Sequence, residues 1–265
     1  MPVNIKSFIP KKSFGQNFLV DQNIIKKIIE ACDLQSNETV LEIGPGQGAL
    51  TKEISQRVQK VIAIEKDRTL AAHLQSMLVG KNVEVIQADI LKYDFTKIPP
   101  RTKIIGNLPY YISTPIIEKV LEHQSRFDQF FMTVQWEYGQ RLVASPNNRD
   151  YGSFSLFVQY HSDVKNLFKI KNSSFYPAPK VQSCFLKLDI LSIPRYKVSN
   201  KELLFKMIQT AFQQRRKTIE NSLSVLYPKE RISKMLRYLC INPQHRAENL
   251  SLKDYVAIAE VLAKE

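Results

Sequence analysis

The sequence predicts an α/β protein with a doubly wound, mostly parallel sheet of about seven strands, followed by a small all-α domain. The first observation is an alternation of apolar, β-rich runs with segments of helical length from about residue 39, which is typical of parallel strands joined by helical crossovers. The second is a change around residues 191–200, after which the apolar patterns have a helical period. We therefore expect two domains, residues 1–194 and residues 195–265.

Each expected element follows from a local pattern. Runs rich in β-branched residues predict the first four strands: Thr39–Ile43, Val61–Glu65, Val83–Gln87 and Lys103–Gly106. The accompanying helices are Ala49–Val58, Arg68–Val79 and Thr114–His123. Later apolar runs complete the sheet: Asp128–Gln135, Phe154–His161 and Val181–Leu188. In the second domain the expected helices are Lys201–Gln213, Lys217–Leu226, Lys229–Tyr238 and Leu252–Leu262.

The charge balance favours an anionic partner. The 265 residues include 38 Lys and Arg against 25 Asp and Glu, a net charge of +13, and 44% of the residues are hydrophobic. Residues 195–265 hold 14 basic and 7 acidic side chains, so positive charge is densest there. Such an excess is typical of globular proteins that bind nucleic acid or acidic membranes, the alternative being a merely solubilising surface.

Targeting and metal-binding signals are missing from the sequence. Residues 1–10 lack the apolar core of a secretory signal, and the apolar runs are too short to span a bilayer. Cys32, Cys184 and Cys240 are scattered and form no metal-type pair, and the four His form no ligand cluster. We expect a cytoplasmic protein with no metal and no membrane association.

A glycine-rich loop follows the first predicted strand. Three of the eight glycines lie within residues 44–48, and a strand, glycine loop and helix in this order let the backbone approach a ligand closely. Glu65 ends the second run and Asp89 follows the third, so both carboxylates lie where open α/β sheets bind ligands. A carboxylate at Glu65 can accept hydrogen bonds from both hydroxyls of a ribose. The spacing Gly44-x-Gly46-x-x-Ala49 also fits a dinucleotide site, so the loop alone leaves an NAD-dependent oxidoreductase open.

The fourth run ends in Gly106-Asn107-Leu108-Pro109-Tyr110-Tyr111, which favours chemistry on an amine. An exocyclic amine is a poor nucleophile because its lone pair is delocalised into the ring. The Asn107 side-chain oxygen and a carbonyl beside Pro109 can accept its two N–H bonds and so free the lone pair. Tyr110 offers a flat face on which an extruded base can stack. The segment resembles the Asn/Asp-Pro-Pro-Tyr type motif of S-adenosylmethionine-dependent amino methyltransferases, which decides against the oxidoreductase.

Further motifs extend the resemblance over nearly the whole chain. In order they are residues 11–19 (KKSFGQNFL), the 42–49 loop, Asn107–Tyr111, residues 175–181 (FYPAPKV) and residues 214–218 (QRRKT). This combination closely resembles the ribosomal RNA adenine N6,N6-dimethyltransferase family, and within it the bacterial small-subunit type. The resemblance implies a Rossmann-like methyltransferase domain in residues 1–194, with RNA recognition by residues 195–265. It also implies two adjacent adenosines near the 3′ end of 16S rRNA as the substrate.

The resemblance also assigns site residues. The catalytic set is Asn107, Leu108, Pro109, Tyr110 and Phe175, with Phe175 expected on the other face of the flipped base. The set that binds S-adenosylmethionine is Asn17, Leu19, Gly44, Glu65, Asp89 and Asn107. In this set Gly44 lies against the methionine part, Glu65 binds the ribose, and Asp89 accepts from the adenine edge. Catalysis is then expected to rest on positioning and on the Asn107 acceptors, without a strong general base.

Basic clusters are the expected contacts to RNA phosphates: Lys11, Lys12, Arg215, Arg216 and Lys217. One departure follows the second cluster, where Ile219-Glu220-Asn221 stands in place of the Leu-Arg-Asn that the family predicts. The expected partner is 16S rRNA in the immature 30S subunit, bound by a monomer. Two alternatives stay open: a related 23S rRNA adenine methylase that confers antibiotic resistance, and a non-catalytic ribosome-assembly or RNA-binding factor.

Overall fold

The structure of the chain, a computed structural model, describes residues 9–11 and 14–263 and divides them into two compact units. The first comprises Met1–Gly139 and Val164–Ser192, and the second comprises Gln140–Asp163 and Ile193–Glu265, each within the described residues. The expected border at residue 194 lies close to the last division. Residues 140–163, which the sequence analysis assigned to the first domain, belong instead to the compact unit of the C-terminal helices.

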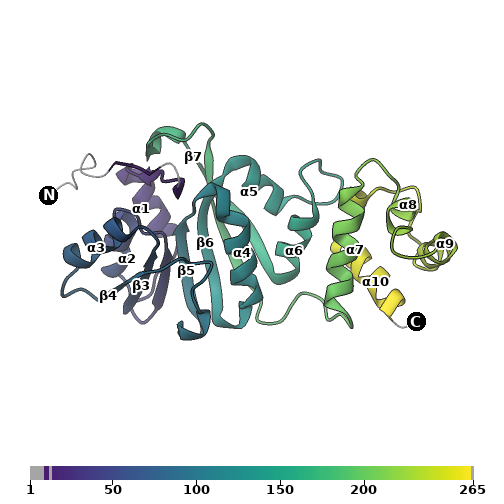
Figure 1. The fold of residues 1–265 in the computed structure, drawn as a ribbon, viewed down its shortest axis with the longest axis horizontal. Coiled ribbons are helices and arrows are strands. Elements are labelled where there is room, and N and C mark those ends of the chain that lie inside the picture. Colours follow the sequence, from purple (N-terminus) through teal and green to yellow (C-terminus); the bar gives the residue numbers. More distant parts are fainter. Residues whose placement is uncertain (1–8, 12–13, 264–265) are drawn as a thin grey trace. The chain divides into compact units, whose positions relative to one another are not determined.

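A seven-stranded sheet forms the first unit, in the order β4-β3-β2-β5-β6-β9-β7 (Figure 1). Its strands are β2 (Thr39–Ile43), β3 (Lys60–Glu65), β4 (Val83–Gln87), β5 (Thr102–Asn107), β6 (Phe127–Gln135), β7 (Ser162–Ile170) and β9 (Ser183–Ile190). The strands β4, β3, β2, β5 and β6 pair in parallel, and β9 pairs antiparallel to β6. The predicted α/β class with a mostly parallel sheet is confirmed.

Helices and a short ribbon complete the first unit. The helices are α1 (Gln22–Ala31), α2 (Ala49–Ser55), α3 (Arg68–Met77), α4 (Ser113–Glu122) and α5 (Trp136–Val143), the last of which contains the division at Gly139. Ile28 of α1 and Ile54 of α2 share one core cluster with Val40 and Phe131 of the sheet. Separately, β1 (Phe18–Leu19) pairs antiparallel with β8 (Phe175–Tyr176), which ties the N-terminal segment to the segment before β9.

The predicted strand Phe154–His161 is wrong: the segment is helix α6 (Ser153–His161). Its aromatic residues suggest a strand, but they recur at helical spacing. The Phe154 and Phe157 rings stack with their centroids 5.7 Å apart, and the centroids of the Phe157 and His161 rings are 5.0 Å apart. The seventh strand is β7, which the sequence analysis missed because exposed Lys165 and Lys169 interrupt its apolar pattern, as is usual for an edge strand.

The second unit is helical, with α6 joined by α7 (Lys201–Gln213), α8 (Ile219–Leu223), α9 (Lys229–Tyr238) and α10 (Leu252–Ala263). These helices enclose a core that includes Met207, Ile232 and Tyr255. Helix α8 begins later than expected because Thr218 caps its first turn by accepting from the Asn221 N–H, and it ends at Leu223, before the expected Leu226. Among the described residues, no helix has both the length and the apolar character needed to cross a membrane.

Candidate active site

The glycine loop between β2 and α2 adopts a backbone that side chains disfavour. Gly44, Gly46 and Gly48 have φ of 66°, 59° and 81°, all in the left-handed region. A Cβ on Gly46 would lie 3.1 Å from the Phe18 ring, and one on Gly48 would lie 2.6 Å from Leu74. At Gly44 nothing lies within 4 Å of that position, so the backbone there faces open space. The loop therefore packs tightly on one side and leaves Gly44 accessible to a ligand.

Glu65 lies at the end of β3 and supports this loop. One carboxylate oxygen accepts from the Gly46 N–H at 3.0 Å, and the other accepts from the Asp67 N–H at 2.8 Å. Burial raises the pKa of Glu65, and the backbone hydrogen bonds to its carboxylate act in the opposite direction. Each oxygen has a second lone pair, so the carboxylate can hold the loop and still accept from ligand hydroxyls.

Asp89 follows β4 and is paired with Lys66, whose Nζ lies 2.9 Å from Oδ2. Oδ1 accepts from the Leu91 N–H at 3.0 Å. Partial burial acts to raise the pKa of Asp89, but the hydrogen bonds from Lys66 and Leu91 outweigh it and lower the pKa below its usual value. Asp89 is therefore a charged acceptor at neutral pH.

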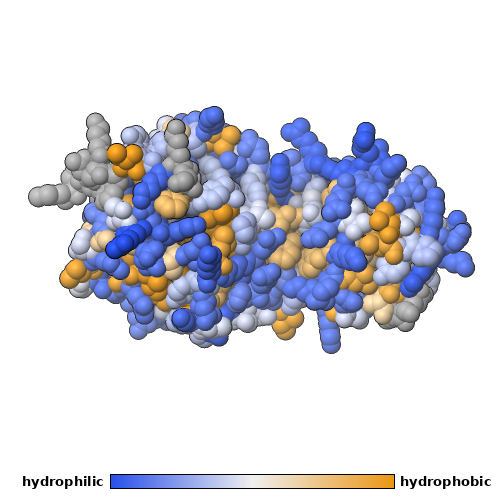
Figure 2. Space-filling view, viewed as in Figure 1, coloured by the Kyte–Doolittle hydropathy of each residue, from blue (hydrophilic) through white to orange (hydrophobic). Residues whose placement is uncertain are grey.

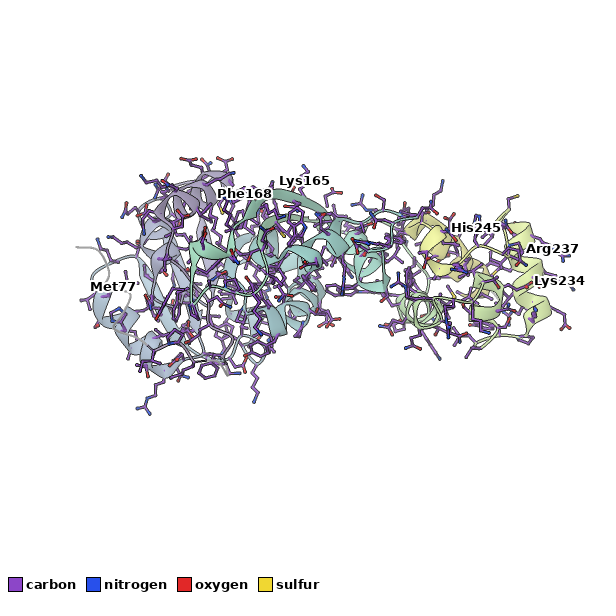
Figure 3. All side chains as sticks on the ribbon, turned by 90° about the horizontal axis from the view of Figure 1, so that it is seen from above. Met77, Lys165, Phe168, Lys234, Arg237 and His245 are labelled. Carbon is purple, nitrogen blue, oxygen red and sulfur yellow. The ribbon has the colours of Figure 1, made fainter. Side chains whose placement is uncertain are left out.

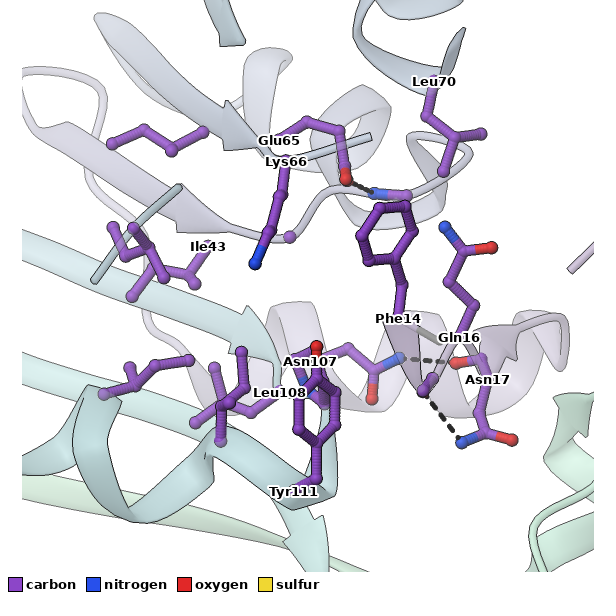
Figure 4. A pocket seen from close by; sticks show the side chains of 18 of the residues that line it. Phe14, Gln16, Asn17, Ile43, Glu65, Lys66, Leu70, Asn107, Leu108 and Tyr111 are labelled. Carbon is purple, nitrogen blue, oxygen red and sulfur yellow. Dashed lines mark hydrogen bonds between the residues drawn. The ribbon is translucent and has the colours of Figure 1, made fainter. Parts of the chain in front are cut away.

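Asn107 ends β5 and its amide is held by the N-terminal segment (Figure 4). Its Nδ2 donates to the main-chain oxygen of Asn17 at 2.8 Å, and the Asn17 side chain in turn donates to the Gly15 carbonyl at 3.2 Å. Because the NH₂ group of Asn107 is engaged there, the orientation of the amide is fixed and Oδ1 is the atom left to accept a hydrogen bond from a ligand.

These groups meet in one cavity of the first unit, with about 780 Å³ of empty space that includes its open mouth. It brings together eight predicted site residues: Asn17, Gly44, Glu65, Asp89, Asn107, Leu108, Pro109 and Tyr110. Phe14 and Gln16 also line it, as do Lys66 and the exposed Tyr111 (Figure 4). None of these four residues was expected in the site from the sequence, although Phe14, Gln16 and Tyr111 lie within its motifs.

Two predicted site residues do not line the cavity. The side chains of Leu19 and Phe175 are buried, with 6% and 3% of their surface exposed, in a core cluster that also contains Phe185. They face each other in register in the β1–β8 ribbon. Their apolar side chains gain more from this packing than from partial exposure at a ligand site. In this structure Phe175 therefore presents no open ring face, and its stacking on the target base stays a prediction.

Lys11 is engaged within the first unit. The Lys11 Nζ lies 2.9 Å from both carboxylate oxygens of Asp67, and the main-chain N–H of Lys11 donates to Gln16 Oε1 at 2.8 Å. Gln16 also donates to Asp67 at 3.2 Å. The predicted phosphate contact at Lys11 would compete with this ion pair. Lys12 lies outside the described residues, and Arg215, Arg216 and Lys217 are exposed in the second unit.

Glu42 is a buried acidic residue in β2, two residues before Gly44 of the glycine loop. Burial raises its pKa to about 8, and Oε2 has no hydrogen-bond partner among the described residues. The unfolded chain loses this proton near the ordinary glutamate pKa of 4.5, whereas the folded chain keeps it to about 8. The folded state therefore binds more protons in this range, and its stability falls as pH rises from 4.5 to 8.

Glu42→Gln should remove this pH dependence. We expect the variant to be more stable than the parent at pH 8, with the difference shrinking toward pH 5. One proton changes the free energy of unfolding by at most about 1.4 kcal/mol per pH unit. Urea unfolding between pH 5 and pH 8 measures the effect, with the exposed Glu30→Gln as the control. Parallel pH profiles for the parent and Glu42→Gln would contradict the assignment.

The chain is similar to proteins that methylate ribosomal RNA. The family model for ribosomal RNA adenine dimethylases matches residues 8–264. A "ribosomal RNA small subunit methyltransferase A" from Moorella thermoacetica is 40% identical over 98% of this chain and 95% of its own length. The protein of the same name from Alkaliphilus oremlandii is also 40% identical, over 96% of this chain and 92% of its own.

Two solved structures share the fold. A dimethyladenosine transferase from Plasmodium falciparum matches with a TM-score of 0.81 and 26% identity, covering 93% of this chain and 98% of that one. The 23S rRNA methyltransferase ErmE matches with a TM-score of 0.74 and 27% identity, over 93% and 100% of the two chains. The family model spans the glycine loop, the carboxylates at the strand ends and the Asn107 segment, and by this match the chain belongs to the ribosomal RNA adenine dimethylase family.

Proposed function

We propose that this chain transfers methyl groups from S-adenosylmethionine to N6 of two adjacent adenosines near the 3′ end of 16S rRNA. Its substrate is then the immature 30S subunit, and the enzyme acts as a cytoplasmic monomer. The observation that carries the proposal is the fixed amide of Asn107, a residue that lines the same cavity as Glu65 and Asp89.

The cavity fits the methyl donor. Gly44 leaves open space beside the backbone for the methionine part, and Glu65 offers acceptor lone pairs to the ribose hydroxyls. Asp89 is a charged acceptor near the next strand end, suited to the exocyclic amine of adenine. When bound, S-adenosylmethionine supplies an electrophilic methyl group on a sulfonium, which is a good leaving group.

The residues of the chain act on the target amine. Asn107 Oδ1 and a carbonyl beside Pro109 accept its two N–H bonds, which draws the nitrogen toward tetrahedral geometry and frees its lone pair. Tyr110 offers its ring to the extruded base. After methyl transfer the product amine releases its proton to solvent, so no strong base is needed. The rate enhancement then comes from positioning and from acceptors oriented before the reaction.

RNA recognition is assigned to the second unit. Arg215, Arg216 and Lys217 are exposed between α7 and α8, and Lys234 and Arg237 extend from α9 (Figure 3). Hydrophilic side chains cover much of this unit on the face shown in Figure 2. A target adenine must leave its stack at a cost of a few kcal/mol, and phosphate contacts elsewhere on the RNA offset that cost.

The decisive experiment is transfer of tritiated methyl groups into immature 30S subunits, purified 16S rRNA and 23S rRNA, followed by mapping of the modified base. We expect dimethyladenosine at two adjacent positions near the 3′ end of 16S rRNA. Product in 23S rRNA would favour the alternative of a 23S rRNA methylase; the 23S rRNA methyltransferase ErmE shares the fold of this chain. Binding to subunits without any methyl transfer would favour a non-catalytic assembly factor.

Glu65→Ala should weaken S-adenosylmethionine binding by about 1–3 kcal/mol, because two charge-assisted hydrogen bonds to the ribose are lost. The change also releases the Gly46 N–H, so the loop loses support. Isothermal titration calorimetry measures the affinity, and RNA binding, measured separately, should change little. Unchanged affinity for S-adenosylmethionine would remove Glu65 from the ribose site.

A further inference from the structure

The hydroxyl of Tyr110 is bound by a residue from a distant part of the chain. Tyr110 Oη lies 2.6 Å from Oγ of Ser183, a hydrogen bond in which either oxygen can donate. Ser183 is the first residue of β9 and its side chain is fully buried. Tyr110 is half-buried and lines the cavity. The bond therefore links the wall of the cavity to the interior of the sheet.

The strands explain why this contact is rigid. Asn107 of β5 lies in register with Thr133 of β6, and the Leu108 N–H donates to the Thr133 carbonyl at 3.2 Å. Two residues farther along β6, Gln135 lies in register with Ser183 of β9. The segment 107–110 thus begins at the end of β5, donates to β6 through the Leu108 N–H and bonds to β9 through the Tyr110 hydroxyl, so three hydrogen-bonded strands fix both its start and that hydroxyl.

A fixed ring favours stacking. An aromatic side chain held only at its Cα must lose rotational freedom when a base stacks on it, which weakens binding. A ring anchored at its hydroxyl has lost that freedom on folding. Burial raises the pKa of Tyr110, although the Ser183 bond opposes the rise, so the hydroxyl is neutral and the bond is complete at physiological pH.

We propose that Ser183 is a positioning residue for methyl transfer, which acts by fixing the Tyr110 ring as the platform for the target adenine. The inference rests on the proposed function, because it takes Tyr110 to be the base-stacking residue. Ser183 contacts neither the target base nor the methyl donor in this scheme, and its whole effect passes through the Tyr110 hydroxyl.

The test compares Ser183→Ala, Tyr110→Phe and the double variant. Single-turnover methyl transfer into immature 30S subunits gives the rate, and calorimetry gives the affinity for S-adenosylmethionine. Each single variant should lower the rate about 5- to 10-fold, the usual effect of removing one hydrogen bond. The double variant should be no slower than the slower single variant, and cofactor affinity should not change. Ser174→Ala is the matched control, because that buried hydroxyl bonds to Asp21 and does not line the cavity.

The outcomes separate this inference from the proposed function. A loss from Ser183→Ala that persists in the Tyr110→Phe background means that Ser183 does not act through Tyr110, and overturns the inference. Parental rates for Tyr110→Phe overturn it too, even where Ser183→Ala fails to fold. Tyr110→Ala tests the platform itself: a parental rate there removes Tyr110 from the target site, and with it this part of the proposed function.

Discussion

Asn107→Asp should lower the single-turnover rate of methyl transfer by about 100-fold or more, although it preserves the size of the side chain and its acceptor oxygens. The reason is the contact on the other side of the amide. Nδ2 of Asn107 donates to the Asn17 carbonyl at 2.8 Å. A carboxylate oxygen in that place would face a carbonyl oxygen with no hydrogen between them, so the side chain must turn away and the acceptor leaves its position.

Asn107→Ala removes the acceptor altogether and should be at least as slow. Both variants should bind S-adenosylmethionine with a smaller loss than the loss in rate, because the acceptor matters most in the transition state. Asn23→Asp, an exposed change of the same charge on α1, is the control. A parental rate for Asn107→Asp would show that the Asn17 contact does not orient the catalytic amide.

The parts of this fold that were predictable from sequence are those with a local cause. The strands β2 to β5 are short apolar runs followed by turns, and the glycine loop has three left-handed residues where only glycine is unstrained. Helix α6 was not predictable from composition, because its aromatic residues suit a strand and a helix equally until their spacing is compared. Edge strand β7 lacked an apolar run because one side of it is exposed.

The residues of the candidate site also divide into those whose place has a local cause in the sequence and those whose place depends on distant contacts. Glu65 and Asn107 are the last residues of their strands and Asp89 follows one, so parallel pairing alone brings them to one edge of the sheet. The partner of Asn107 is a main-chain oxygen of Asn17, 90 residues away in the chain, and a backbone atom leaves no mark in a sequence pattern. The burial of Phe175 likewise depends on the register of the β1–β8 ribbon, which no periodicity in two-residue strands could predict.

The departure at Glu220 has a structural reason. Its carboxylate accepts a hydrogen bond from Ser233 of α9 and lies 3.8 Å from Lys229 Nζ. Glu220 therefore links α8 to α9 within the second unit. Replacing it with arginine, which simple charge arguments favour for tighter RNA binding, would first break this link. The basic residues just before α8 are the better test of an RNA surface.

Neutralising Arg215, Arg216 and Lys217 together as Gln should weaken binding to 30S subunits by about 10- to 100-fold, since each exposed phosphate interaction contributes about 0.5–1 kcal/mol. The slope of log affinity against log salt should flatten by about 0.7–0.9 for each phosphate that is no longer neutralised. Affinity for S-adenosylmethionine should persist, because its predicted ligands lie in the other unit. Filter binding over a range of about 50 to 200 mM salt measures both quantities.

The three side chains should not contribute equally. Arg215 donates to the Arg149 carbonyl at 2.9 Å and lies 3.9 Å from Glu248, so its guanidinium is partly engaged in holding the second unit together. Arg216→Gln and Lys217→Gln should therefore change the salt slope without changing stability, whereas Arg215→Gln should change both. The triple change of exposed Lys52, Lys81 and Lys97 to Gln removes the same charge from the first unit and is the control. Equal slopes for the control and the 215–217 variant would mean that net charge, and not this surface, determines RNA binding.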